Sequence, residues 1–128
     1  APAPAAPAPK PAKKAKAKAK GKPTPSAPSA VTAAPATLND RGKALIDSGR
    51  PAEAIAPLAG AVQGYRASGQ TTGLPYAYAL YNLGNALRLA GRPAEAIPYL
   101  EERLRVSSNQ RPVVERELAI ARRQADGN

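Results

Sequence analysis

The heptapeptide GRPAEAI occurs twice in this chain without a change, first as residues 49–55 and again as residues 91–97. The two copies are 42 residues apart. Internal repetition with a period of roughly 20 to 50 residues is typical of stacked-repeat architectures, in which each unit buries its apolar face against the next copy. The repeat therefore predicts a stack of similar units. Such stacks present extended binding surfaces more often than catalytic pockets.

Each copy of the heptapeptide lies between two runs with helical periodicity. In the run before the second copy, the apolar positions with helical spacing are Leu80, Leu83 and Leu87. Gly49 and Gly91 follow such runs, at the place where a helix ends in a left-handed residue. Pro51 and Pro93 come two residues later and suit the first position of a new helix. Each unit is therefore expected to be a helical hairpin with glycine at its corner.

These patterns predict an all-α domain over residues 37–126. Its parts are a first hairpin over 37–67, a second hairpin over 75–106 and a C-terminal capping helix over 111–124. In the capping helix Val114, Leu118 and Ala121 share the apolar face, and the charged residues, Glu117 among them, are expected elsewhere. Small residues at Gly42 and Gly84 are expected where the two helices of each hairpin come closest.

Residues 1–36 differ sharply in composition from the rest of the chain. They contain nine of the 15 prolines. None of their apolar side chains is larger than valine, so none can anchor a core. Seven lysines give this segment a charge of +7, at Lys10, Lys13, Lys14, Lys16, Lys18, Lys20 and Lys22. Such a composition cannot offset its ordering entropy by burial, so the segment is predicted to be a disordered basic linker.

The composition also excludes several kinds of site. The chain has no histidine and no cysteine, which rules out Ser-His-Asp and Cys-His catalysis, zinc sites of the usual kind and disulfides. We therefore expect a protein that is not an enzyme, with no cofactor, no metal and no small-molecule substrate.

The second repeat resembles the tetratricopeptide repeat (TPR) family. The residues that carry the resemblance are Leu80, Leu83, Gly84, Leu87, Gly91, Ala96 and Leu100. In the first repeat they are Leu38, Gly42, Leu45, Gly49, Ala54, Leu58 and Ala61. One departure is Arg103, which stands where the family prefers a small residue. The resemblance implies a stack of two TPR-like hairpins.

In the resembled family, ligand peptides lie across the inner faces of the first helices of the hairpins. The matching positions are Asn39, Lys43, Tyr78, Tyr81, Asn82, Asn85 and Arg88. Asparagine pairs with both N–H and C=O groups of an extended peptide, and tyrosine adds apolar area with a polar tip. The alternative is that Asn82 and Asn85 are consensus residues on a solvated helix. Since only Lys43 and Arg88 supply cations on this face, the carboxylate-clamping specificity of part of the family is not expected.

Two classes of function remain open. The first is a protein-interaction module on a flexible basic stalk, part of a larger signalling protein, which binds a protein or peptide partner and associates weakly with itself. The second is a polyanion-associating protein whose lysine tail contacts DNA, a cell-wall polymer or an anionic membrane surface. The linker and repeats together also resemble the C-terminal region of high-GC bacterial transmembrane Ser/Thr protein kinases. If that likeness holds, it implies that this region lies on the extracytoplasmic side of a bacterial membrane. If it does not hold, a cytoplasmic location is expected.

Overall fold

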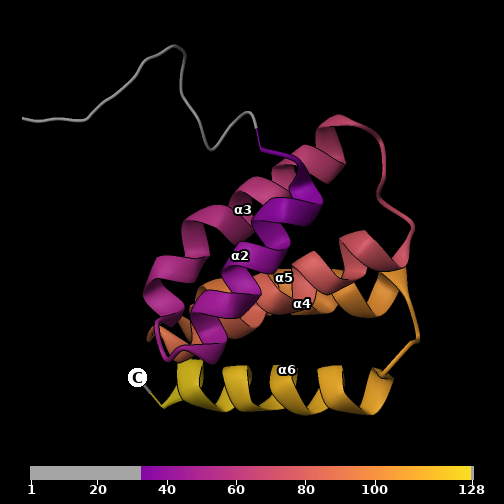
Figure 1. Ribbon diagram of the computed structural model, residues 1–128. Helices are drawn as coiled ribbons and strands as arrows, with labels where there is room; N and C mark the ends of the chain where they lie inside the picture. The colour runs from indigo at the N-terminus through magenta and orange to yellow at the C-terminus, as the bar shows by residue number, and fades with distance from the viewer. Residues whose placement is uncertain (1–32, 128) are drawn as a thin grey trace, which may run out of the picture. The chain divides into compact units, whose positions relative to one another are not determined.

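The computed structural model describes residues 33–127, and within this range every element of regular structure is an α-helix. The elements are α2 (Pro35–Asp47), α3 (Pro51–Ala67), α4 (Leu74–Leu89), α5 (Pro93–Val106) and α6 (Arg111–Asp126) (Figure 1). The all-α prediction is confirmed. The predicted disorder of the basic linker concerns residues that lie almost entirely outside the described part. Helix α2 begins at Pro35, two residues before the expected start of the first hairpin.

The five helices form two hairpins and a single final helix. Helix α2 packs on α3 and α4 packs on α5, while α3 also contacts α4 and α5 contacts α6. Helices α2 and α6 both contact α4 (Figure 1). The first helices of the hairpins therefore lie side by side, and α6 takes the position that the first helix of a third unit would occupy. None of the helices in residues 33–127 combines the length and hydropathy that a bilayer span requires.

The repeated heptapeptide forms the corner of each hairpin, as predicted. Gly49 has a φ of 78°, and its N–H donates to the Ile46 carbonyl at 3.0 Å. The next N–H, of Arg50, donates to the Leu45 carbonyl at 2.8 Å, which completes a Schellman motif. The second corner, at Gly91, has the same pair of bonds with a φ of 87°. The Arg50 guanidinium also binds the Glu53 carboxylate, so the heptapeptide carries its own ion pair.

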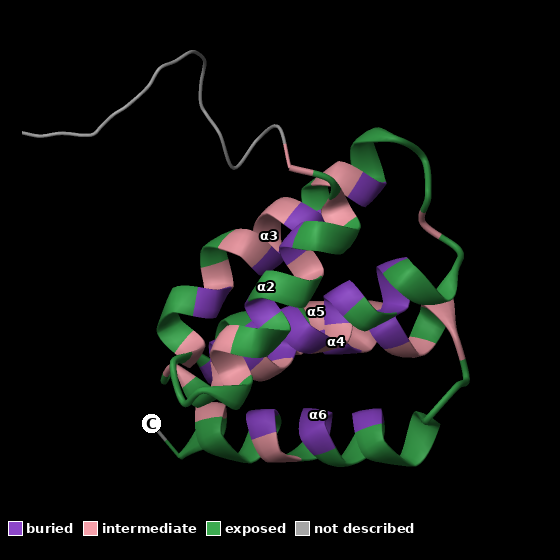
Figure 2. Ribbon diagram, in the orientation of Figure 1, coloured by how far each residue is buried: buried purple, intermediate pink, exposed green. Residues whose placement is uncertain are grey.

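The two helices of each hairpin touch where a glycine faces a leucine. A Cβ atom on Gly42 would lie 2.3 Å from Leu58 Cγ, and one on Gly84 would lie 2.7 Å from Leu100 Cγ. Both leucines are completely buried. Figure 2 shows that the buried residues of α6 likewise lie on its side toward the other helices. The two short distances confirm that the small residues at Gly42 and Gly84 allow the helices to approach closely.

A second set of contacts joins the first hairpin to the second. Arg66 on α3 donates from Nε to the hydroxyl of Tyr76 on α4 at 2.9 Å, and from Nη2 to Glu102 on α5 at 2.8 Å. The Tyr76 hydroxyl in turn donates to Glu102. The Tyr76 ring packs edge-on against Tyr65, with ring centroids 6.3 Å apart. This network fixes the angle between the hairpins and so shapes the opposite face of the stack.

Candidate functional site

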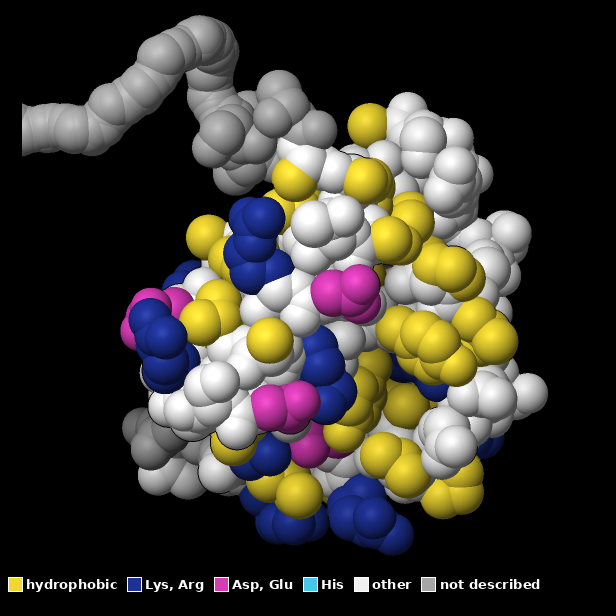
Figure 3. All heavy atoms as spheres, in the orientation of Figure 1, with side chains coloured by type: hydrophobic (Ala, Val, Ile, Leu, Met, Phe, Trp, Pro, Cys, Tyr) yellow, Lys and Arg dark blue, Asp and Glu magenta, His cyan; other side chains and the backbone are white. Residues whose placement is uncertain are grey.

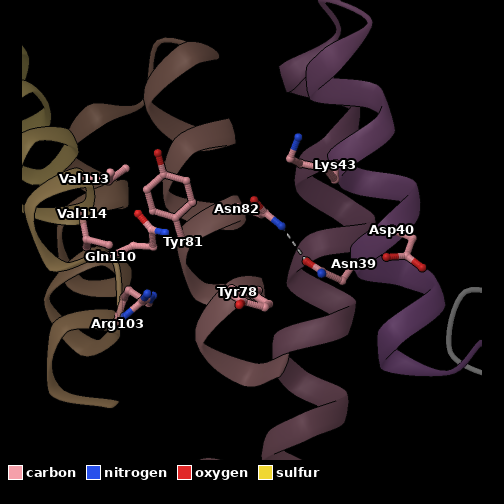
Figure 4. A pocket seen from close by; sticks show the side chains of 10 residues that line it. All are labelled: Asn39, Asp40, Lys43, Tyr78, Tyr81, Asn82, Arg103, Gln110, Val113 and Val114. Carbon is pink, nitrogen blue, oxygen red and sulfur yellow. Dashed lines mark hydrogen bonds between the residues drawn. The ribbon is translucent and has the colours of Figure 1, made fainter. Parts of the chain in front are cut away.

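A cavity of about 390 Å³ opens on the face formed by α2, α4 and the start of α6. Its lining comprises Asn39, Asp40 and Lys43 from α2, Tyr78, Tyr81 and Asn82 from α4, Arg103 from α5, and Gln110, Val113 and Val114 at the start of α6 (Figure 4). We call this cavity the groove. Helices α2, α4 and α6 lie side by side, and they build the groove together with Arg103 of α5.

Five of the seven residues predicted for the partner-binding face line the groove. They are Asn39, Lys43, Tyr78, Tyr81 and Asn82. The Asn82 Nδ2 atom donates to Asn39 Oδ1 at 2.9 Å, which links α4 to α2 across the floor (Figure 4). This bond leaves Asn39 Nδ2 as a donor and Asn82 Oδ1 as an acceptor, each without a protein partner in the described part of the chain.

The other two predicted residues, Asn85 and Arg88, lie outside the groove and bind Glu117 of α6. Asn85 Nδ2 donates to Glu117 Oε2 at 2.8 Å, and Arg88 donates to both carboxylate oxygens. Glu117 is only 6% exposed. The prediction that Glu117 lies away from the apolar face of α6 was wrong. Val114, Glu117, Leu118 and Ala121 share one helical face. That spacing, visible in the sequence, was the signal for its burial.

Arg103 is a groove residue that the sequence analysis did not predict. Its side chain is 2% exposed, and its Nη1 and Nη2 atoms donate to the carbonyls of Ser107 and Asn109 at 2.8 and 2.5 Å. The Nε atom is buried without a hydrogen-bond partner. Burial lowers the pKa of Arg103 from its ordinary value. The sequence signal was its departure from the small residue that the TPR pattern prefers.

The mouth of the groove is apolar. Tyr78 and Val113 are 45% and 39% exposed, so the edge of the cavity presents two large apolar side chains to solvent. Burial raises the pKa of Tyr81, so its hydroxyl stays protonated and able to donate. Lys43 Nζ binds Asp47 at 3.0 Å in an exposed ion pair on α2. On the face seen in Figure 3, hydrophobic side chains gather on the right, and most visible charged side chains lie to the left and below.

Antiparallel helical hairpins that stack through their successive helices define a helical-repeat scaffold. The groove lies on the face that the first helices of the hairpins share. The family model for the tetratricopeptide repeat matches residues 33–109, more than half of the 128-residue chain, and the chain belongs to this family. No curated protein and no solved structure matches the chain. Tetratricopeptide repeats generally mediate protein–protein interaction, and the family typically supplies non-enzymatic scaffolds. The matched range ends before α6.

Proposed function

We propose that this chain is a non-enzymatic protein-interaction module that binds an extended segment of a partner protein in the groove. The observation that supports this most directly is the composition of the cavity, in which exposed Tyr78 and Val113 form an apolar mouth above a floor of amide groups. A volume of about 390 Å³ is enough for a few side chains of a peptide.

The floor of the groove suits a peptide backbone. Asn39 Nδ2 and Asn82 Oδ1, which have no protein partner among the described residues, offer one donor and one acceptor at the two ends of the bonded amide pair (Figure 4). An extended chain presents C=O and N–H groups along its length, so the amide pair can bind the backbone of any sequence. The exposed Tyr78 ring then supplies apolar area to a neighbouring side chain at little cost in conformational entropy.

The proposal is tested by selecting peptides from a displayed random library on the full chain and measuring their affinity by fluorescence anisotropy. Tyr78→Ala should weaken groove-binding peptides by about tenfold or more, since central aromatic contacts contribute about 2 kcal/mol to such interfaces. Tyr99→Ala is the matched control, because Tyr99 on α5 is half-buried and lies outside the groove. Circular dichroism should show the same helicity in all three proteins.

Equal affinity of the selected peptides for the wild type and for Tyr78→Ala would contradict the groove assignment.

The polyanion-binding alternative depends on lysines outside the described residues and stays a prediction. Deleting residues 1–32 separates the two classes of function, because peptide binding in the groove should survive the deletion and polyanion binding should not.

A further inference from the structure

Arg103 is the one buried charged side chain of residues 33–127 that has no oppositely charged partner. Three polar side chains are buried in this range, namely Asn82, Arg103 and Glu117. Asn82 bonds to Asn39, and Glu117 forms an ion pair with Arg88. Arg103 has only the neutral carbonyls of Ser107 and Asn109, and its Nε–H has no acceptor. A buried charge without a counter-charge destabilises a fold, so its presence calls for an explanation.

The rest of the described chain does not provide the missing carboxylate. All six glutamates are held in ion pairs with other arginines, and Asp47 is held by Lys43. Asp40 borders the groove from α2 but is exposed and forms no ion pair with Arg103. Asp126, in the last turn of α6, is exposed and does not line the groove. Arg103 therefore has no carboxylate partner among the described residues, although seven of the nine acidic side chains there are each paired with a lysine or an arginine.

The guanidinium of Arg103 lies on the wall of the groove opposite α2. Figure 4 shows it pointing from α5 toward the space beside Tyr78 and Tyr81. The only other charged groups on the lining are Lys43 and Asp40 at the α2 edge. The groove thus combines an apolar mouth with a net positive charge at its inner wall, and a low-dielectric setting strengthens the field of that charge.

We propose that the partner segment carries a carboxylate side chain, from glutamate or aspartate, which enters the groove and forms an ion pair with Arg103, with Nε–H as the free donor. This inference rests on the proposed function and specifies the chemistry of the ligand. The lysine-rich segment of the same chain is not the occupant, because it has the same sign of charge as Arg103. The formal net charge of +10 also favours encounter with an acidic partner.

The direct test is NMR of the full-length wild-type protein with two small probes, N-acetyl-glutamate N-methylamide and its glutamine counterpart. The ¹H–¹⁵N signal of Arg103 Nε should shift progressively with the glutamate probe and stay in place with the glutamine probe. The Nε signal of Arg66 is the internal control, because it already donates to Tyr76 outside the groove. It should not move with either probe. No substitution is needed, so the result does not depend on whether an Arg103 variant folds.

The selected peptides give a second, independent readout. Those that lose affinity with Tyr78→Ala should share an acidic residue, and its replacement by the matching amide should weaken binding by about tenfold or more, as expected for a hydrogen bond to a charged group. Groove-binding peptides without a shared acid, or an Arg103 Nε signal that responds equally to both probes, would overturn the inference and leave the proposed function intact. If no selected peptide is sensitive to Tyr78→Ala, the proposed function itself fails.

Discussion

Gly42→Ala tests whether the closest contact between α2 and α3 depends on the absence of a side chain. The added Cβ would lie 2.3, 2.5 and 3.0 Å from Leu58 Cγ, Cδ2 and Cδ1. Carbon atoms normally approach to about 3.5–4.0 Å, so at least one of the two helices must move. Leu58 is completely buried and its branch point is the nearest atom. The leucine therefore cannot simply turn aside.

Two effects of opposite sign determine how much Gly42→Ala changes the free energy of unfolding. Overpacking a filled core costs about 1–3 kcal/mol, and the short distance places Gly42→Ala near the upper end of that range. Replacing glycine by alanine inside a helix contributes about 1 kcal/mol in the other direction. We expect a net loss of about 2 kcal/mol in the free energy of unfolding. Gly84→Ala should cost less, because its shortest distance to Leu100 is 2.7 Å.

The assay is urea unfolding, followed by circular dichroism at 222 nm, of the wild type, Gly42→Ala, Leu58→Ala and the double variant. Leu58→Ala removes all three atoms that the new methyl group would meet, at a cost of about 2–5 kcal/mol for the cavity. In that background Gly42→Ala should become stabilising by up to about 1 kcal/mol, because only the helix-propensity effect remains. If Leu58→Ala is too unstable in buffer, all four proteins are compared at one fixed concentration of trimethylamine N-oxide.

The change of sign is the decisive result. If Gly42→Ala costs the same with and without the Leu58 side chain, steric contact with Leu58 is not the cause, and the reasoning is refuted. If the destabilisation by Gly42→Ala disappears in the Leu58→Ala background but does not become a stabilisation, steric contact with Leu58 is the cause. The expected contribution of helix propensity would then be contradicted.

Three further predictions follow from other parts of the fold. Glu117→Gln should destabilise the protein by about 1–3 kcal/mol, because it leaves Arg88, whose side chain is only 14% exposed, without its carboxylate. Glu115→Gln on the same helix, which breaks an exposed pair, should stay within about 0.5 kcal/mol in the same urea titration. Gly49→Ala should cost roughly 1–2 kcal/mol through backbone strain alone, since φ is +78° and nothing lies within 4 Å, and a neutral result in thermal unfolding would contradict this. Burial raises the pKa of Tyr65 above its ordinary value of 10.0, so the stability it contributes is fully present below about pH 10 and is lost as the pH rises through the raised pKa. Tyr65→Phe should reduce that alkaline loss in unfolding measured across the range, and the remainder comes from Tyr76 and Tyr81, whose pKa burial also raises. An unchanged slope would show that Tyr65 does not contribute to it.

The sequence predicted most of the fold because its strongest signals are local. The left-handed φ at Gly49 and Gly91 and the helix starts at Pro51 and Pro93 depend on a few adjacent residues. Helical periodicity then assigned the buried faces. The groove was predicted at Tyr78 and its neighbours through the family resemblance, which identifies the inner face without knowledge of the angle between hairpins.

Glu117 and Arg103 were not predicted to be buried, although both left a signal in the sequence. Charged side chains are expected at the surface, and only a partner from another element makes burial favourable. Glu117 is buried because Arg88 and Asn85 of α4 lie opposite it, and these residues lie about 30 positions earlier in the chain. Arg103 is buried because the turn from α5 to α6 folds back over it and offers two carbonyls.

The repeated GRPAEAI and the periodic leucines by themselves determined that this chain forms helical hairpins, where those hairpins turn, and which face of each helix is apolar. Only the tertiary structure decided that the predicted capping helix, α6, binds Asn85 and Arg88 through a buried carboxylate, and that a guanidinium remains uncompensated in the groove. The physical reason is the separation along the chain of the residues that determine each property. Turn geometry and helix periodicity are properties of adjacent residues, whereas the pairing of buried charges depends on which distant helices come to lie side by side.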